Sequence, residues 1–285
     1  MPDRTMAGKT VLVTGATSGI GRVMASELAA LGARVGIVGR DPARTEAVRD
    51  AIRAAGTNQA VESFLCDFSS QKSIRALARE VDARFDRLHV LVNNAGAVNG
   101  SRRVTEDGLE LTFAVNHLGY FLLTELLLPR LKASAPARIV STASAAHFGQ
   151  RIDFDDLQGE KGYRAFRAYG RSKLANILFT RELARRIAGT GVTANCFHPG
   201  VVRSGFARND KGLIALGAKL GGLFMISPEK GADTGVWLAT APELEGVSGK
   251  YFAKRREARG SPAARDEATA KRLWDASEQL VSPSA

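Results

Sequence analysis

The sequence of 285 residues contains little cysteine and lacks long uncharged apolar runs. Its two cysteines, Cys66 and Cys196, are far apart and form no CxxC pair, which excludes a disulfide-stapled scaffold and predicts a reduced, cytoplasmic chain. The longest apolar window, 111–124, contains Asn116 and His117 and falls short of the ~18 residues of a membrane span. The first residues lack the apolar stretch of a signal peptide, so we expect no integral membrane segment. The four histidines have no metal-ligand spacing, and no metal is expected.

Acidic residues are outnumbered: 40 Lys and Arg stand against 29 Asp and Glu, giving a formal net charge of +11. The basic residues are spread along the chain and form no stripe with interleaved aromatics, so no nucleic-acid binding is expected. A basic surface also attracts anionic ligands, while an acidic partner or a membrane surface stays open as the alternative. With 45% hydrophobic and 24% charged residues the composition is that of a globular protein, which excludes disordered and coiled-coil chains.

Short apolar, β-branched segments alternate along the chain with segments of helical periodicity. Strands are expected at 9–14, 34–39, 60–66, 88–93, 138–142 and 192–197, and helices at 19–31, 43–55, 71–85, 104–132 and 166–188. This βαβα alternation predicts an α/β fold with a doubly wound parallel sheet of Rossmann type. No linker interrupts it, so we expect one domain over 1–285, with a cofactor half at about 8–135 and a catalytic half at about 136–285. Ligands of such sheets bind beyond the carboxyl ends of the strands.

The first expected strand ends in a glycine-rich turn, which reads Thr14-Gly15-Ala16-Thr17-Ser18-Gly19-Ile20-Gly21. The turn follows a strand and opens a helix within a βαβ unit, which is the setting of a dinucleotide site. Glycines allow a tight turn and let backbone amides approach a pyrophosphate at the helix N-terminus. The spacing is TGxxxGxG, whereas the common fingerprint is GxGxxG.

The turn is the first of an ordered set of motifs that resembles the short-chain dehydrogenase/reductase family. The set continues with the NNAG motif at 93–96, Asn116, Ser144, the YGRSK motif at 169–173, and Pro199-Gly200. The segment FDDLQGEKGY and the C-terminal stretch GVSGKYF…SPAARDEATAKRLW resemble the retinol-dehydrogenase-like branch. The resemblance implies hydride transfer between a nicotinamide cofactor and a carbonyl compound or alcohol.

The resemblance also implies the cofactor contacts: Gly15, Thr17, Ser18, Gly19, Ile20, Gly21, Asp67, Phe68, Asn94, Ala95, Gly96, Tyr169, Lys173, Pro199, Gly200 and Val202. An acid about 20 residues beyond the glycines would hold the ribose of NAD, and Asp41 fits that count. Asp41 precedes Pro42, however, and is interpreted as a helix N-cap. Arg40 directly follows the second strand, where its guanidinium can bind a 2′-phosphate, so NADP(H) is expected in preference to NAD(H).

Tyr169 and Lys173 lie four residues apart in an expected helix and therefore share a face. The ammonium is expected to lower the pKa of the phenol, about 10 when free, so that Tyr169 serves as acid and base. By resemblance, Ser144 rather than Ser141 binds the substrate oxygen, because retinol-dehydrogenase-like members place the serine at this longer separation from the tyrosine. Asn116 would anchor a water on the proton path to Lys173.

The segment 203–227 is apolar and interrupted by glycines, and by resemblance it is a helical substrate lid. Such a lid suits a small hydrophobic carbonyl or alcohol substrate, while a core helix or a homo-oligomer interface stays open for it. Because the sequence begins without the apolar anchor of membrane-bound members, a retinoid in a membrane is not the expected substrate. Two other functions stay open, a C=C reductase of the same fold and a non-catalytic NADP(H)-binding redox sensor.

Overall fold

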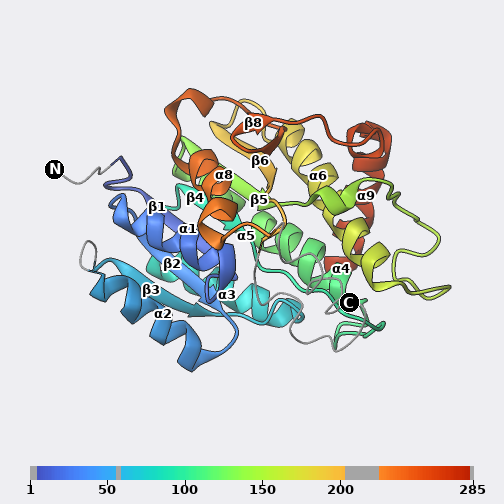
Figure 1. Ribbon diagram of the computed structural model, residues 1–285, viewed down its shortest axis with the longest axis horizontal. Coiled ribbons are helices and arrows are strands. Elements are labelled where there is room, and N and C mark those ends of the chain that lie inside the picture. The colour runs from blue at the N-terminus through green and yellow to red at the C-terminus, as the bar shows by residue number, and fades with distance from the viewer. Residues whose placement is uncertain (1–4, 56–58, 203–224, 283–285) are drawn as a thin grey trace.

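The computed structural model describes residues 5–55, 59–202 and 225–282. Its strands join in one sheet of eight, ordered β3-β2-β1-β4-β5-β6-β7-β8, with β8 as the antiparallel member (Figure 1). The strands are β1 Thr10–Thr14, β2 Arg34–Gly39, β3 Val61–Leu65, β4 Val90–Asn93, β5 Ala137–Thr142, β6 Val192–His198, β7 Tyr251–Ala253 and β8 Arg256–Glu257. The predicted doubly wound α/β sheet is confirmed.

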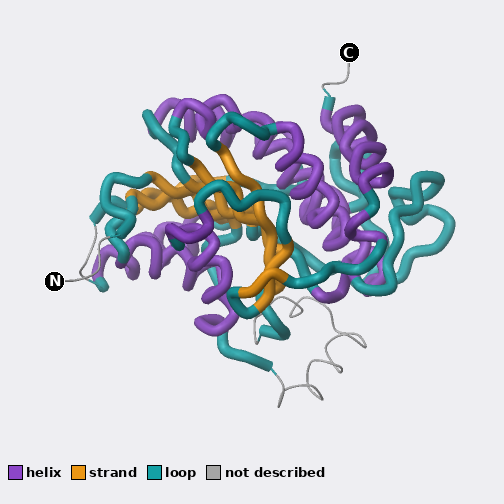
Figure 2. The backbone as a smooth tube through the Cα atoms, turned by 90° about the horizontal axis from the view of Figure 1, so that it is seen from above, coloured by secondary structure: helices purple, strands orange, loops and turns teal. Residues whose placement is uncertain are grey.

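Helices cover both faces of the sheet (Figure 2). The helices are α1 Gly19–Ala30, α2 Pro42–Ala54, α3 Gln71–Arg84, α4 Leu111–Phe113, α5 Gly119–Ala133, α6 Ala165–Arg186, α8 Pro228–Thr240 and α9 Glu267–Val281, with a π-helix at Ala114–Leu118 and 3₁₀ turns at Ala145–His147, Pro242–Leu244 and Ala263–Arg265. One apolar core lies under α1, α2 and α8, and the other lies under α3, α5, α6 and α9. The two cores leave the carboxyl ends of the strands free for a site.

The helix expected at 104–132 begins later than its apolar pattern indicates. Glu110 ends the preceding loop, and its carboxylate accepts the N–H groups of Thr112 and Phe113 at 2.8 and 2.7 Å. These bonds satisfy first-turn donors, so the helix starts at Leu111. Residues 104–110 instead form a loop closed by a bridge between Val104 and Glu110.

One helical run in the described part of the chain, Leu111–Ala133, is long and apolar enough to cross a membrane. In the fold, however, 72% of its most apolar window is buried. Leu123, Leu127 and Leu131 belong to the core between the sheet, α3 and α6. Packing within the protein therefore accounts for the apolar side chains of this run.

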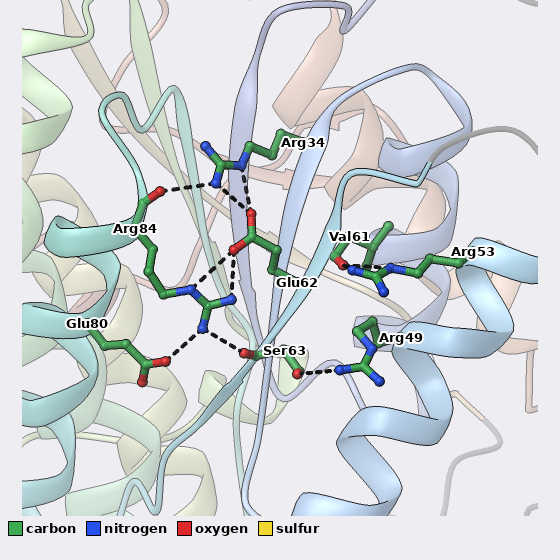
Figure 3. Close-up of polar contacts among 8 residues, drawn as sticks. All are labelled: Arg34, Arg49, Arg53, Val61, Glu62, Ser63, Glu80 and Arg84. Atoms are coloured by element: carbon green, nitrogen blue, oxygen red, sulfur yellow. Dashed lines mark hydrogen bonds and ion pairs between the residues drawn. The ribbon is translucent and has the colours of Figure 1, made fainter.

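Arginine side chains cover the exposed edge of the sheet at β3 (Figure 3). Arg53 of α2 donates two hydrogen bonds to the carbonyl of Val61, at 2.6 and 3.0 Å. Arg84 of α3 donates to the carbonyl of Ser63 at 3.1 Å and holds the carboxylate of Glu62 at 2.7 Å. Unpaired groups on an edge strand are a template for another strand, and these guanidinium groups occupy two of its acceptors.

Candidate active site

Asn94 joins the carboxyl ends of β1, β4 and β5. Its side-chain amide donates to the carbonyls of Thr14 and Gly15 at 3.0 and 3.3 Å, and its carbonyl oxygen accepts from Thr142 at 3.3 Å. In return, the hydroxyl of Thr14 accepts the backbone N–H groups of Asn94 and Ala95 at 2.8 and 3.0 Å. The motif at 93–96 is thereby fixed against the glycine-rich turn.

The glycine-rich turn is packed too closely for side chains at two positions. Gly15 has φ +64°, and a Cβ there would lie 2.7 Å from the Cα of Ala95. A Cβ on Gly21 would lie 2.3 Å from the carbonyl oxygen of Gly15. Among the described residues, the side chain of the N-cap Ser18 makes no capping bond to α1. The first-turn amides therefore lack the side-chain cap that Ser70 gives α3, and they fit a pyrophosphate.

The interpretation of Asp41 as a helix cap is confirmed. Its carboxylate accepts the N–H of Arg44 at 2.8 Å and begins α2. Arg40 is exposed and makes no hydrogen bond or ion pair with any other described residue. A Cβ on Gly39 would lie 2.2 Å from the hydroxyl of Thr45, so the strand end has no room for a carboxylate side chain. At the end of β2, Arg40 is thus a polar side chain that has no partner in the described part of the chain.

Asp67 and Phe68 follow β3, as the motif order implies. The carboxylate of Asp67 accepts the backbone N–H and the hydroxyl of Ser69 at 2.9 and 2.7 Å. Phe68 is buried against α5, where a Cβ on Gly119 would lie 2.8 Å from its ring. Asp67 therefore shapes its own loop, and the cofactor contacts assigned to both residues stay predictions.

The segment after β6 returns to the start of α1. Gly200, after Pro199, has φ +91°, and Val202 pairs with Ile226 in an isolated parallel bridge. A Cβ on Gly231 of α8 would lie 2.6 Å from Val202 and 2.8 Å from Ile20, so these two side chains meet there. The predicted lid, 203–227, lies outside the described residues except for 225–227.

Tyr169, Lys173 and Ser144 come together between α6 and the end of β5. Tyr169 forms a side-chain hydrogen bond with Ser144. The ammonium of Lys173 lies 5.7 Å from the centre of the Tyr169 ring and donates to the carbonyl of Thr142 at 3.0 Å. Ser141 is buried within β5, and its hydroxyl has no hydrogen-bond partner among the described residues. The structure thus brings Ser144, and not Ser141, to the tyrosine.

Burial sets the protonation of this pair. It raises the pKa of Tyr169, although the hydrogen bond with Ser144 acts in the opposite direction. Burial also lowers the pKa of Lys173 to about 7, because the residue is 2% exposed and no acidic group in the described part of the chain shifts it. The expectation that Lys173 lowers the pKa of Tyr169 is wrong for the cofactor-free protein, since an amine that loses its proton near neutral pH attracts a phenolate little. Tyr169 therefore keeps its proton at neutral pH.

Comparison with known proteins agrees with this geometry. Residues 9–212 match the family of the short chain dehydrogenases. The chain belongs to the short-chain dehydrogenase/reductase family. It is 50% identical to mouse retinol dehydrogenase 12 over 274 residues, which cover 96% of this chain and 86% of the relative. It is therefore an oxidoreductase acting on CH–OH or C=O groups, of the retinol-dehydrogenase-like branch.

Solved structures show the same fold. An uncharacterised protein from Mycobacterium paratuberculosis superposes with a TM-score of 0.79 at 34% identity, covering 96% of this chain and 94% of that one. A short chain dehydrogenase from Burkholderia cenocepacia, solved in complex with NADP, superposes with a TM-score of 0.70 at 27% identity, covering 87% of this chain and 96% of that one. Use of a nicotinamide cofactor follows from this family and fold.

Asn116 lies in the π-helix, an irregularity that often marks functional sites. Its carboxamide closes a ring with the backbone of Ala97, accepting the N–H at 2.7 Å and donating to the carbonyl at 2.9 Å. It also donates to the hydroxyl of Ser172 at 3.0 Å, next to Lys173 on α6. The side chain of Asn116 thus connects the loop after β4 to α6, the helix that carries Tyr169 and Lys173. Its role in binding a water stays a prediction.

Two residues beside Lys173 were not found from the sequence. Asn176 donates to the carbonyl of Thr142 at 3.2 Å and so shares the acceptor of the Lys173 ammonium. Tyr120 is fully buried, with its ring centre 5.6 Å from that ammonium. Asn176 could have been found from its helical spacing to Lys173. Tyr120 comes from α5, and only the packing of the fold shows that it lies near Lys173.

Proposed function

We propose that this short-chain dehydrogenase interconverts a hydrophobic carbonyl compound and its alcohol with NADP(H) as the cofactor. The observation that carries the proposal is the cluster of Ser144, Tyr169 and Lys173 at the carboxyl edge of the sheet. The cluster is linked to the glycine-rich turn through Asn94, which bonds both Thr142 and Gly15. The first-turn amides of α1, which the turn opens, lack a side-chain cap from Ser18. One end of the site therefore fits a dinucleotide, and the other fits a polar atom that exchanges a proton.

In the reductive direction, the protonated phenol of Tyr169 gives its proton to the carbonyl oxygen of the substrate. The hydroxyl of Ser144 donates a hydrogen bond to the same oxygen as negative charge develops there. Lys173, held by the carbonyl of Thr142, stabilises the phenolate that remains on Tyr169 when the amine carries its proton. A nicotinamide, when bound, supplies or receives the hydride. The three side chains thus handle the proton and the charge on the oxygen.

Apolar side chains around the site support a hydrophobic substrate. Phe148, Phe166 and Val201 are exposed by 52%, 65% and 60%. Each is close in sequence to a site residue. Phe148 follows the Ser144 turn, Phe166 precedes Tyr169 by one helical turn, and Val201 follows Gly200. Exposed apolar surface at a site binds apolar ligands. Half of the aligned residues are identical to those of mouse retinol dehydrogenase 12, so, contrary to the expectation drawn from the absent anchor, we place all-trans-retinal and retinol in the substrate class.

A carbonyl panel tests the function. With NADPH in excess, turnover followed by the loss of cofactor absorbance should rise from glyceraldehyde through hexanal and decanal to all-trans-retinal, because binding grows with the buried apolar area. Product analysis should find the alcohol. A product of all-trans-retinal that keeps the aldehyde and has lost one C=C bond would instead indicate C=C reduction, and cofactor binding without turnover of any member would indicate a redox sensor. Fastest turnover of glyceraldehyde would contradict the substrate class.

The preference for NADP(H) rests on Arg40, whose guanidinium is exposed at the end of β2. Arg40→Ala should weaken NADPH binding by about 1.5–3 kcal/mol, the range for hydrogen bonds to charged groups, and leave NADH binding nearly unchanged. Both dissociation constants can be measured by the fluorescence of the reduced cofactor. The control is Arg79→Ala, which removes one exposed positive charge from α3 without approaching the strand ends. Equal NADPH affinity in wild type and Arg40→Ala would show that Arg40 faces solvent when the cofactor is bound.

A further inference from the structure

The turn that carries Ser144 is held by the imidazole rings of two histidines. Ser144 is the N-cap of the 3₁₀ turn that follows β5, and its hydroxyl reaches Tyr169. The backbone N–H of the next residue, Ala145, donates to Nδ1 of His198 in β6 at 3.2 Å. His147 ends the same turn and is fully buried. The position of the serine therefore depends on one ring from β6 and on one ring from its own turn.

His147 bridges the serine turn to a distant part of the chain. Its Nδ1 lies 2.6 Å from the carbonyl oxygen of Ser144, and its Nε2 lies 3.1 Å from the backbone nitrogen of Ser261. A backbone N–H can only donate, so Nε2 is the acceptor and the proton resides on Nδ1, which donates to Ser144. Both partners are therefore satisfied only by the neutral ring in one tautomer.

The surroundings fix the His147 ring in that orientation. Tyr251 of β7 meets it edge to face, with ring centres 5.2 Å apart, and the ring of Phe148 lies 4.2 Å away. On the other side of the turn, Gly170 of α6 approaches so closely that a Cβ would lie 2.5 Å from the carbonyl oxygen of Ala146. The turn is thus clamped between α6, which carries Tyr169, and the residues after β8.

Burial favours the neutral His147 ring, and two titratable groups face the bridge. They are His198 of β6 and Tyr251 of β7. Burial lowers the pKa of both His147 and His198, and His147 lowers that of His198 further. Each ring uses one nitrogen as an acceptor for a backbone N–H, and a protonated ring would lose that bond.

We propose that His147 is a positioning residue for the reaction, which holds the hydroxyl of Ser144 at Tyr169 by anchoring the serine turn to the Ser261 segment. The inference rests on the proposed function and adds to it a residue that touches neither substrate nor cofactor. If His147 acts through Ser144, then removing the imidazole ring lowers kcat no further once the serine hydroxyl is absent.

A double-mutant cycle on Ser144 and His147 tests this coupling. With all-trans-retinal and NADPH, His147→Ala should lower kcat on the order of 10- to 100-fold, as a misplaced group does, and should leave the NADPH dissociation constant unchanged. In the Ser144→Ala background, the same change should lower kcat by less than about twofold. His147→Asn should recover part of kcat, because its amide nitrogen takes the place of Nδ1 and still donates to the carbonyl of Ser144.

His89 provides the matched control. It too accepts a backbone N–H, that of Thr10 at 2.9 Å, but it lies at the opposite end of the sheet, at the start of β4. His89→Ala should lower the melting temperature and leave kcat unchanged. Equal losses of kcat from His147→Ala in the wild-type and Ser144→Ala backgrounds would overturn the inference alone. A wild-type protein without turnover of any carbonyl would overturn the proposed function and this inference together.

Discussion

Replacing Tyr169 with Phe is expected to lower kcat for carbonyl reduction by about 10²- to 10⁴-fold, the range for loss of a general acid. The change removes one hydroxyl, which bonds Ser144, and keeps the ring that packs near the Lys173 ammonium. Cofactor affinity should change little, because the glycine-rich turn and Asn94 lie on other elements. Steady-state kinetics with NADPH and a cofactor-binding titration separate the two effects.

Tyr163 offers the control for this substitution. Its hydroxyl donates to the carbonyl of Asn99 at 2.8 Å and bonds the hydroxyl of Thr112 at 3.2 Å, so it too is a hydrogen-bonded tyrosine. It lies before α6 and outside the cluster of Ser144 and Lys173. Tyr163→Phe should therefore keep kcat near that of the wild type. Normal turnover by Tyr169→Phe would show that another group gives the proton, and the assignment of the acid would be wrong.

The central sheet could be predicted from the sequence because its strands are buried on both faces. Such strands appear as continuous apolar runs, and 34–39 was predicted with the bounds that β2 has. The strands β7 and β8 were missed, since segments of three and two residues have too few positions to show a period. The late start of the helix at Leu111 also escaped prediction, because glutamate is an uncommon N-cap and the apolar periodicity continues through the loop before it.

The pairing of site residues could be predicted only where it is local. Tyr169 and Lys173 lie on one helix face, so their spacing was sufficient. The bridge through His147 joins Ser144 to Ser261, and no local pattern connects residues so far apart in the chain. The direction of the pKa shift of Tyr169 could not be predicted from the sequence either, because it depends on the burial of Tyr169 and Lys173 and not on their separation.

Replacing Lys173 with Met is expected to abolish most turnover and to stabilise the cofactor-free protein. The lysine is buried, and burial lowers its pKa from the ordinary 10.5 to about 7, which means that the fold disfavours the charged amine. Met fills a similar volume without a charge, and apolar replacement of buried charged groups can raise the free energy of unfolding by about 1–4 kcal/mol. The carbonyl of Thr142 would keep its bond from Asn176, so no buried acceptor is left unpaired.

The stability gained by Lys173→Met should depend on pH. Below pH 7 the wild-type lysine is protonated in both the folded and the unfolded chain, so the fold bears the full cost of the buried charge. Between pH 7 and 10.5 the unfolded chain holds more protons than the folded one, so the wild-type free energy of unfolding rises with pH and the gain shrinks. Urea unfolding of wild type and Lys173→Met at pH 6, 8 and 9.5 measures this gain in the free energy of unfolding. The control is Lys72→Met on the exposed face of α3. A gain that is absent, or constant across this range, would show that the buried ammonium is compensated by the folded protein, and the lowered pKa would then be wrong.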